Sequence, residues 1–209
     1  MLKYQDKRYA DNYLELLNAV RAKDEAINGV ATELTSVAAK SLHKLLAYKD
    51  EYEVARLYTD GEFLKKLNNT FEGDYKLQFH LAPPLLSKVG ADGFPVKRVF
   101  SAWVQSAFKV LARLKGLRGT RWDIFGYSAE RRAERSLAHE FISQLDTVLP
   151  HISKDNVSIA IELFKLVDDI RGFGHVKVEA IAQYRVRRDQ LIKRLTSDIV
   201  QLVDIHNAA

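Results

Sequence analysis

The sequence predicts a mainly α-helical fold, a helical bundle with one non-helical excursion. Through most of the chain, apolar residues recur at three- and four-residue steps, the period of a helix with one face in a core. That period fails around residues 74–99. Four prolines and ten glycines in 209 residues, with 47% apolar residues, are typical of a globular protein.

The apolar stripes and the residues that end them predict the helices one by one. Asn28-Gly29 is expected to end the first helix, because both residues tolerate the left-handed conformation. Thr32, Ser128 and Ser153 each precede an apolar stripe and are expected to serve as N-caps. Helices are expected over about residues 7–27, 33–49, 51–58, 61–71, 101–115, 128–149, 153–167 and 176–205. The helix over residues 101–115 is expected to bury one apolar face, formed by Trp103, Val104, Ala107, Phe108, Leu111 and Leu114.

The excursion has the two-residue period of a strand. Apolar and polar side chains alternate over residues 75–80, and Pro83-Pro84 ends the pattern. After a glycine-containing turn, residues 96–99 are expected to return as a second short strand. A small β-hairpin around residues 74–99 is one interpretation, and an ordered loop laid over the helices is the other.

The chain is long enough for one substantial domain, or for one domain with a helical appendage. We expect residues 1–30 to form an N-terminal helix that could link to upstream domains. Residues 31–209 are then expected to form the helical C-terminal module.

No motif for catalysis or for a cofactor is complete. The chain has no cysteine, which excludes disulfides, thiolate zinc, a cysteine nucleophile and cysteine-ligated iron–sulfur clusters within it. The six histidines include no pair three or four residues apart on one helix. A thiamine-diphosphate motif needs Gly-Asp-Gly followed by paired asparagines, whereas Ala91 breaks that triplet and Asn68-Asn69 precedes it. We therefore assign no catalytic, cofactor-binding or metal-binding residue.

Charge and hydropathy favour a cytoplasmic protein without membrane spans. The first ten residues are polar, and no run approaches the ~18 apolar residues that a membrane helix needs. Lysine and arginine number 32 against 27 acids, for a net charge of +5. This excess is mild, so nucleic acid is not the favoured partner. Self-association stays open.

One stretch combines basic and aromatic residues. Between residues 113 and 135 there are seven basic residues and three acids, with three aromatic residues among them. Such a stretch can hold phosphates and stack on planar ligands, or it can form an arginine-rich docking face. Two histidines in non-helical segments are added as candidate contacts. The candidate contact residues are Arg113, Lys115, Arg118, Arg121, Trp122, Tyr127, Arg131, Arg132, His80 and His175.

Several uncommon strings occur in order along the chain. They are KDEYEVARL at residues 49–57, FEGDYKLQFHLAPP at 71–84, LKGLRGT at 114–120, FGY at 125–127 with ERR at 130–132, and IRGFGHVK at 170–177. Together they resemble the C-terminal region of the large fused bacterial indolepyruvate ferredoxin oxidoreductases, from about residue 5 to about residue 180.

The resemblance implies a part of a larger enzyme. Enzymes of that family oxidatively decarboxylate aryl pyruvates to acyl-CoA with thiamine diphosphate, coenzyme A and iron–sulfur clusters, and they pass electrons to ferredoxin. Their cofactor motifs lie upstream of the matched region, so no catalytic residue is carried over. The implied partners are upstream catalytic domains of the same polypeptide and ferredoxin.

Three functional interpretations follow. The first is a non-catalytic C-terminal module of such an oxidoreductase, which packs on the catalytic domains or shapes the approach of a partner. The second is a stand-alone helical module that binds a phosphorylated ligand or RNA through residues 113–135, with affinity that falls as salt rises. The third is a purely structural helical domain whose basic clusters only keep it soluble.

Overall fold

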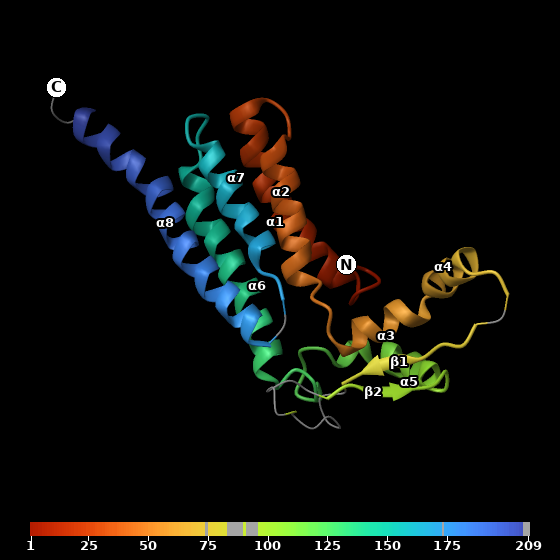
Figure 1. The fold of residues 1–209 in the computed structure, drawn as a ribbon. Coiled ribbons are helices and arrows are strands. Elements are labelled where there is room, and N and C mark those ends of the chain that lie inside the picture. Colours follow the sequence, from red (N-terminus) through yellow and green to blue (C-terminus); the bar gives the residue numbers. More distant parts are fainter. Residues whose placement is uncertain (74, 83–89, 91–95, 173, 207–209) are drawn as a thin grey trace. The chain divides into compact units, whose positions relative to one another are not determined.

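The computed structural model describes residues 1–73, 75–82, 90, 96–172 and 174–206, without the side chains of 175 and 198–206. The fold is mainly α-helical, as predicted (Figure 1). Single 3-10 turns follow three of the helices. The elements are α1 Lys7–Asn28, α2 Glu33–Leu46, α3 Glu51–Thr59, α4 Glu62–Thr70, β1 Phe79–Leu81, β2 Arg98–Phe100, α5 Val104–Arg113, η1 Leu114–Leu117, α6 Ala129–Val148, η2 Leu149–His151, α7 Val157–Lys165, η3 Leu166–Asp169 and α8 Gly174–His206.

The chain forms two compact units. Unit 1 consists of Met1–Ala47 and Ala133–Ala209, and unit 2 is the intervening Tyr48–Arg132. This division differs from the predicted boundary at residue 30, because α1 packs along α2 within unit 1. The glycine stop signal after Asn28 marks a helix end: Gly29 has φ 79° and its N–H donates to the carbonyl of Glu25 at 2.8 Å.

Unit 1 is a bundle of α1, α2, α6, α7 and α8 (Figure 1). Its core is built from one apolar face of each helix. The largest fully buried side chains there include Leu34, Leu42, Phe141, Phe164, Tyr184 and Leu195. Ion pairs connect α6 to α8: Glu134 pairs with Lys177, and Glu140 pairs with Arg185 and Arg188.

The start of α2 is capped by a residue of α1. Thr32 is the N-cap residue, as predicted from its position, but its hydroxyl makes no capping bond. Instead the buried Asp24 carboxylate accepts from the backbone N–H of Thr32 at 2.6 Å and of Thr35 at 3.1 Å. It also accepts from both threonine hydroxyls and from the Asn28 amide. Four of these five hydrogen bonds therefore join α1 to the N-cap and first turn of α2, and the bond from Asn28 lies within α1.

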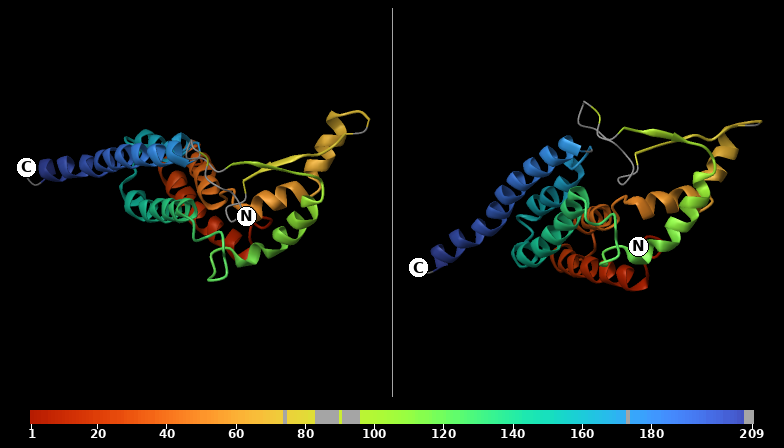
Figure 2. Two further views of the ribbon diagram at one scale, coloured as in Figure 1. Left: turned by 60° about the horizontal axis from the view of Figure 1, so that its bottom comes forward. Right: turned by 90° about the horizontal axis from the view of Figure 1, so that it is seen from below.

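Unit 2 combines α3, α4, α5 and a small antiparallel hairpin (Figure 2). The strands pair with Phe79 opposite Phe100 and His80 opposite Val99, which confirms the hairpin interpretation. Pairing is shorter than the predicted strand over 75–80, because β1 begins only at Phe79. Its core is aromatic: Tyr58 stacks on Phe108 at 5.5 Å, and Phe79 meets Phe108 edge to face at 5.7 Å.

Two local predictions are wrong. Ser153 does not cap the helix after Pro150; α7 begins at Val157, and the Asn156 side chain instead accepts from the N–H of Ser153 at 2.7 Å. Trp103, Ala107 and Leu114 were expected inside the core, yet all three are exposed, and Trp103 precedes α5. Unit 2 covers only one side of α5, where Val104 and Phe108 are buried, so the second apolar side faces outward.

Candidate functional site

The candidate contact stretch is organised around the N-terminus of α3. Asp50 is the N-cap, and its carboxylate accepts from the N–H of Glu53 at 2.8 Å. The same carboxylate receives Nε and Nη2 of Arg118, the latter at 2.9 Å, in a two-point ion pair. The two side chains are only 6% and 4% exposed. Arg118 was predicted to lie on a contact surface; it is instead an internal residue that joins η1 to α3.

The segment after η1 folds around a second buried carboxylate, Asp123. Its Oδ2 accepts from the N–H of Gly119 at 2.9 Å, and its Oδ1 accepts from the N–H of Gly126 at 3.0 Å. The Tyr52 hydroxyl donates to the same Oδ1 at 3.3 Å. Gly119 has φ 75°, a conformation that a side chain would strain. Residues 117–128, named here the 117–128 loop, are therefore fixed by one carboxylate at their centre.

The loop holds three large apolar side chains out of the core. Trp122 is 64% exposed, and Ile124 and Tyr127 are also more than half exposed. The Arg121 guanidinium lies over the Trp122 ring at 5.3 Å, and the Tyr127 hydroxyl donates to the Arg121 carbonyl at 2.9 Å. Phe125 points the other way and meets Tyr52 edge to face at 5.4 Å. An internally bonded loop thus presents an aromatic surface with one stacked arginine.

The remaining candidate residues do not gather into one basic face. Arg131 pairs with Glu51 at 3.3 Å and lies over the Tyr48 ring, so it too supports the N-terminus of α3. Lys115 is half-buried, whereas Arg113 and Arg132 are exposed. His80 is exposed on β1, away from the loop in sequence. The side chain of His175 lies outside the described residues.

Burial and charge shape the chemistry of Tyr52. Burial, followed by the negative charge of Asp123, raises the pKa of the Tyr52 hydroxyl to about 12. A tyrosine with a raised pKa stays protonated and donates its hydrogen bond, which is a structural role and not that of a general base. This cluster stabilises the loop.

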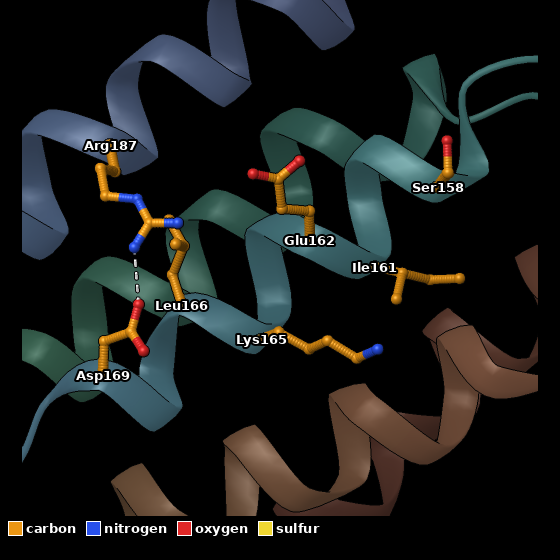
Figure 3. Close-up of a pocket in the computed structure, with 7 residues that line it drawn as sticks. All are labelled: Ser158, Ile161, Glu162, Lys165, Leu166, Asp169 and Arg187. Carbon is orange, nitrogen blue, oxygen red and sulfur yellow. Dashed lines mark hydrogen bonds and ion pairs between the residues drawn. The ribbon is translucent and has the colours of Figure 1, made fainter.

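A separate cavity lies in unit 1 between α7 and α8 (Figure 3). It has a volume of about 400 Å³ and is lined by Ser158, Ile161, Glu162, Lys165, Leu166, Asp169 and Arg187. Arg187 pairs with Asp169 at 2.7 Å, and Lys165 reaches Glu33 of α2 at 2.6 Å. Its two cationic side chains are thus already in ion pairs. Ser158 is the one hydroxyl among the lining residues and has no histidine beside it there, so the lining supplies no activated nucleophile.

In the part of the chain that the structure describes, no three histidine, aspartate or glutamate side chains gather as a metal site. Among the described helices, none combines the length and the hydropathy needed to cross a bilayer. The thiolates that would hold an iron–sulfur cluster are missing from the sequence itself.

A comparison with protein families identifies the family of the chain. The model of a family of unknown function, DUF6537, matches residues 1–190. The chain belongs to DUF6537. No curated protein and no solved structure matches it.

The DUF6537 match covers all of unit 2 and all of unit 1 except the end of α8. Within this span, four of the uncommon sequence strings meet at one place in unit 2. Asp50 and Glu51 come from the first string, Arg118 from the third, and Phe125 and Arg131 from the two that follow. These strings encode the framework of the loop.

Sequence reasoning missed the acidic half of this framework. Asp50 carries a readable signal, because aspartate followed three residues later by glutamate, here Glu53, is typical of a helix start. The sequence signal at Asp123 is weaker, because it is a single acid between Gly119 and Gly126. Reading residues 113–135 only for positive charge overlooked the carboxylates that neutralise two of its arginines.

Proposed function

We propose that this DUF6537 chain is a non-catalytic docking module of an oxidoreductase that resembles the indolepyruvate ferredoxin oxidoreductases. In this role the 117–128 loop packs on the catalytic domains or shapes the approach of a protein that accepts electrons. The sequence strings supply the kinship with that enzyme class, and the loop supplies the docking surface.

One observation carries the docking role: an aromatic surface that is exposed and yet rigidly held. Trp122, Ile124 and Tyr127 are more than half exposed, although the loop beneath them is fixed by Asp123 and by the Arg118–Asp50 pair. Tryptophan, tyrosine and arginine are the residues enriched at protein–protein hot spots. A pre-organised loop also loses less conformational entropy on binding, which favours affinity.

The cofactors of the proposed enzyme would be held elsewhere. The chain has no cysteine for a cluster, and its broken Gly-Asp-Gly pattern does not fit thiamine diphosphate. In this proposal the chain supplies binding surfaces and does not perform a chemical step.

The second interpretation, binding of a phosphorylated ligand or RNA, has weaker support. Arg118 and Arg131 already bind Asp50 and Glu51, which removes two cations from the predicted phosphate-binding stretch. Arg113, Arg121 and Arg132 keep exposed side chains. Such binding would appear as salt-dependent affinity for RNA or coenzyme A at low ionic strength.

The test is a surface substitution in the polypeptide or complex to which the chain belongs. Trp122→Ser combined with Ile124→Ser should lower reduction of ferredoxin with indolepyruvate by about 30-fold or more, since two hot-spot residues at about 1–2 kcal/mol each contribute about 2–4 kcal/mol together. Val186→Ser on α8, equally exposed but in unit 1, is the matched control and should keep full activity.

Unchanged turnover in the Trp122→Ser/Ile124→Ser variant, with hydrogen exchange of the loop also unchanged, would refute the docking role. A gene context without thiamine and cluster motifs, on the same or a neighbouring reading frame, would refute the assignment to this enzyme class.

A further inference from the structure

Helix α5 has two apolar faces, and unit 2 covers only one. Val104 and Phe108 lie in the aromatic core, with Leu111 and Ala112 packed beside them. Trp103, Ala107, Val110 and Leu114 are exposed, and they are spaced by four, three and four residues. Since a helix repeats every 3.6 residues, these four side chains lie in one line along the solvent side of α5. We name them the α5 seam.

The seam extends one residue past each end of the α-helix. Trp103 keeps helical dihedral angles, φ −57° and ψ −28°, and its carbonyl accepts from the N–H of Ser106 at 3.0 Å. Its ring lies 6.0 Å from the Phe100 ring, so it rests against β2 while most of it stays exposed. At the other end, Leu114 opens η1.

Positive charge borders the seam. On a helical wheel, Lys109 and Arg113 fall on the side of the seam that faces away from the core. Both are exposed, and within the described residues neither has a carboxylate at ion-pair distance. The surrounding sequence is also positively charged, since residues 93–122 contain no aspartate or glutamate. Their basic residues are Lys97, Arg98, Lys109, Arg113, Lys115, Arg118 and Arg121.

We propose that the α5 seam is a docking site for an amphipathic α-helix of a partner protein, with apolar residues at heptad spacing and acidic residues beside them. Steps of four and three residues are those of the a and d positions through which two helices interlock. A helix of that kind would bury Trp103, Val110 and Leu114 and place its carboxylates against Lys109 and Arg113. The site is separate from the 117–128 loop, and its test is independent of the function proposed above.

Two other occupants fit the observations less well. In an antiparallel pair of α5 helices from two copies of this chain, the flank with Lys109 and Arg113 would face itself, and like charges in that position repel. A membrane surface would suit the charge, but interfacial helices bury a broad apolar face. The four residues of the α5 seam span only a narrow line, the width of a helix–helix contact.

The experiment uses the whole chain and two synthetic peptides of two heptads, too short to form stable helices alone. Both have leucine at a and d; one has glutamate at e and g, the other lysine. We expect saturable binding of the glutamate peptide by fluorescence anisotropy, with amide shifts confined to α5 and its neighbours. The lysine peptide should bind at least about tenfold more weakly.

Substitutions then locate the site. Val110→Glu should weaken binding of the glutamate peptide by about tenfold or more, and so should Lys109→Glu with Arg113→Glu. Val186→Glu on α8 is the matched control, since Val186 is 61% and Val110 is 59% exposed; it should leave the affinity unchanged. All of these side chains are exposed, so the variants are expected to fold, which circular dichroism checks.

Several results would overturn the proposal. They are absence of binding by the glutamate peptide, equal binding of both peptides, and equal loss in the Val110→Glu and Val186→Glu variants. Self-association of the chain that Val110→Glu abolishes would replace the partner helix by a second copy. Co-sedimentation with phosphatidylserine vesicles that Val110→Glu abolishes, without peptide binding, would replace it by a membrane surface.

Discussion

The guanidinium of Arg118 and the carboxylate of Asp50 form a buried two-point ion pair across 68 residues of sequence. Because Asp50 also caps α3, the pair fixes the start of that helix and the position of η1 at once. The exposed aromatic residues of the 117–128 loop follow directly after Arg118. Stability and presentation of the loop therefore depend on the same contact.

Arg118→Leu should destabilise unit 2 by about 3–5 kcal/mol, because it leaves the Asp50 carboxylate buried without its partner charge. Arg118→Lys should lie between this variant and the parent, since an ammonium cannot make the two-point contact. Hydrogen exchange of residues 117–128 and of the Glu53 amide measures the effect locally. Arg132→Leu, at an exposed position, is the control; equal protection in Arg118→Leu and the parent would contradict the prediction.

Asp123→Ala should loosen the loop without unfolding the helices. The N–H of Gly119 loses its acceptor, so this amide should exchange faster by more than about tenfold. The N–H of Gly126 keeps its bond to the backbone carbonyl of Asp123 at 3.1 Å and should change less. Asp123→Asn keeps one carbonyl oxygen and should show a smaller effect. Asp146→Ala, at an exposed site on α6, should leave both amides unchanged. Residue-resolved exchange by NMR distinguishes these outcomes.

Asp24 should make unit 1 sensitive to acid. Burial alone would raise its pKa, but hydrogen bonds from Thr35, Thr32 and Asn28 hold the pKa of this carboxyl well below its usual range. The unfolded chain therefore takes up a proton more readily than the folded one. The stabilisation is complete above about pH 5 and declines as pH falls through the usual aspartate range and below it.

Asp24→Ala should accordingly lower the free energy of unfolding by about 2–3 kcal/mol at neutral pH, because it leaves the first turn of α2 without a cap. The difference from the parent should shrink in acid. Urea unfolding followed by circular dichroism measures it. Asp11→Ala removes an exposed carboxylate of the same helix and should change stability by less than about 0.5 kcal/mol; a similar loss in both variants would argue against the cap.

Two tyrosines should titrate late. Burial raises the pKa of both Tyr52 and Tyr184 to about 12. Their protonated forms are favoured in the folded state, so their contribution is complete below about pH 10 and is lost as pH rises towards 12. Ultraviolet absorbance of the phenolate should show a late fraction that Tyr52→Phe and Tyr184→Phe each reduce.

Helix ends marked by local chemistry were predictable from the sequence. Gly29 ends α1 as expected, and the Ser128 hydroxyl accepts from the N–H of Arg131 at the start of α6. Each signal works through residues within one turn, which is the range that a sequence pattern reports. The short hairpin was also visible, because alternation of side chains and two prolines bounded β1.

Features set by distant contacts were not predictable. The cap of α2 comes from Asp24 of the preceding helix, so Thr32 gave the right position and the wrong mechanism. In residues 113–135 the positive charges were counted correctly, but the partners of Arg118 and Arg131, Asp50 and Glu51, lie 68 and 80 residues upstream. For α5 the apolar pattern was read as one buried face, because periodicity cannot tell which of two apolar faces the chain covers.

Unit 2 interrupts unit 1 in the sequence: the bundle is assembled from the two ends of the chain, and everything from Tyr48 to Arg132 lies between them. Contacts within unit 2 join residues of one continuous segment, whereas those between α2 and α7 close a loop that contains all of unit 2. Closing a long flexible loop costs more entropy than closing one already made compact. We therefore expect unit 2 to fold first, which shortens the connection between the two sequence segments of unit 1. The helical bundle of unit 1 then forms from these two segments.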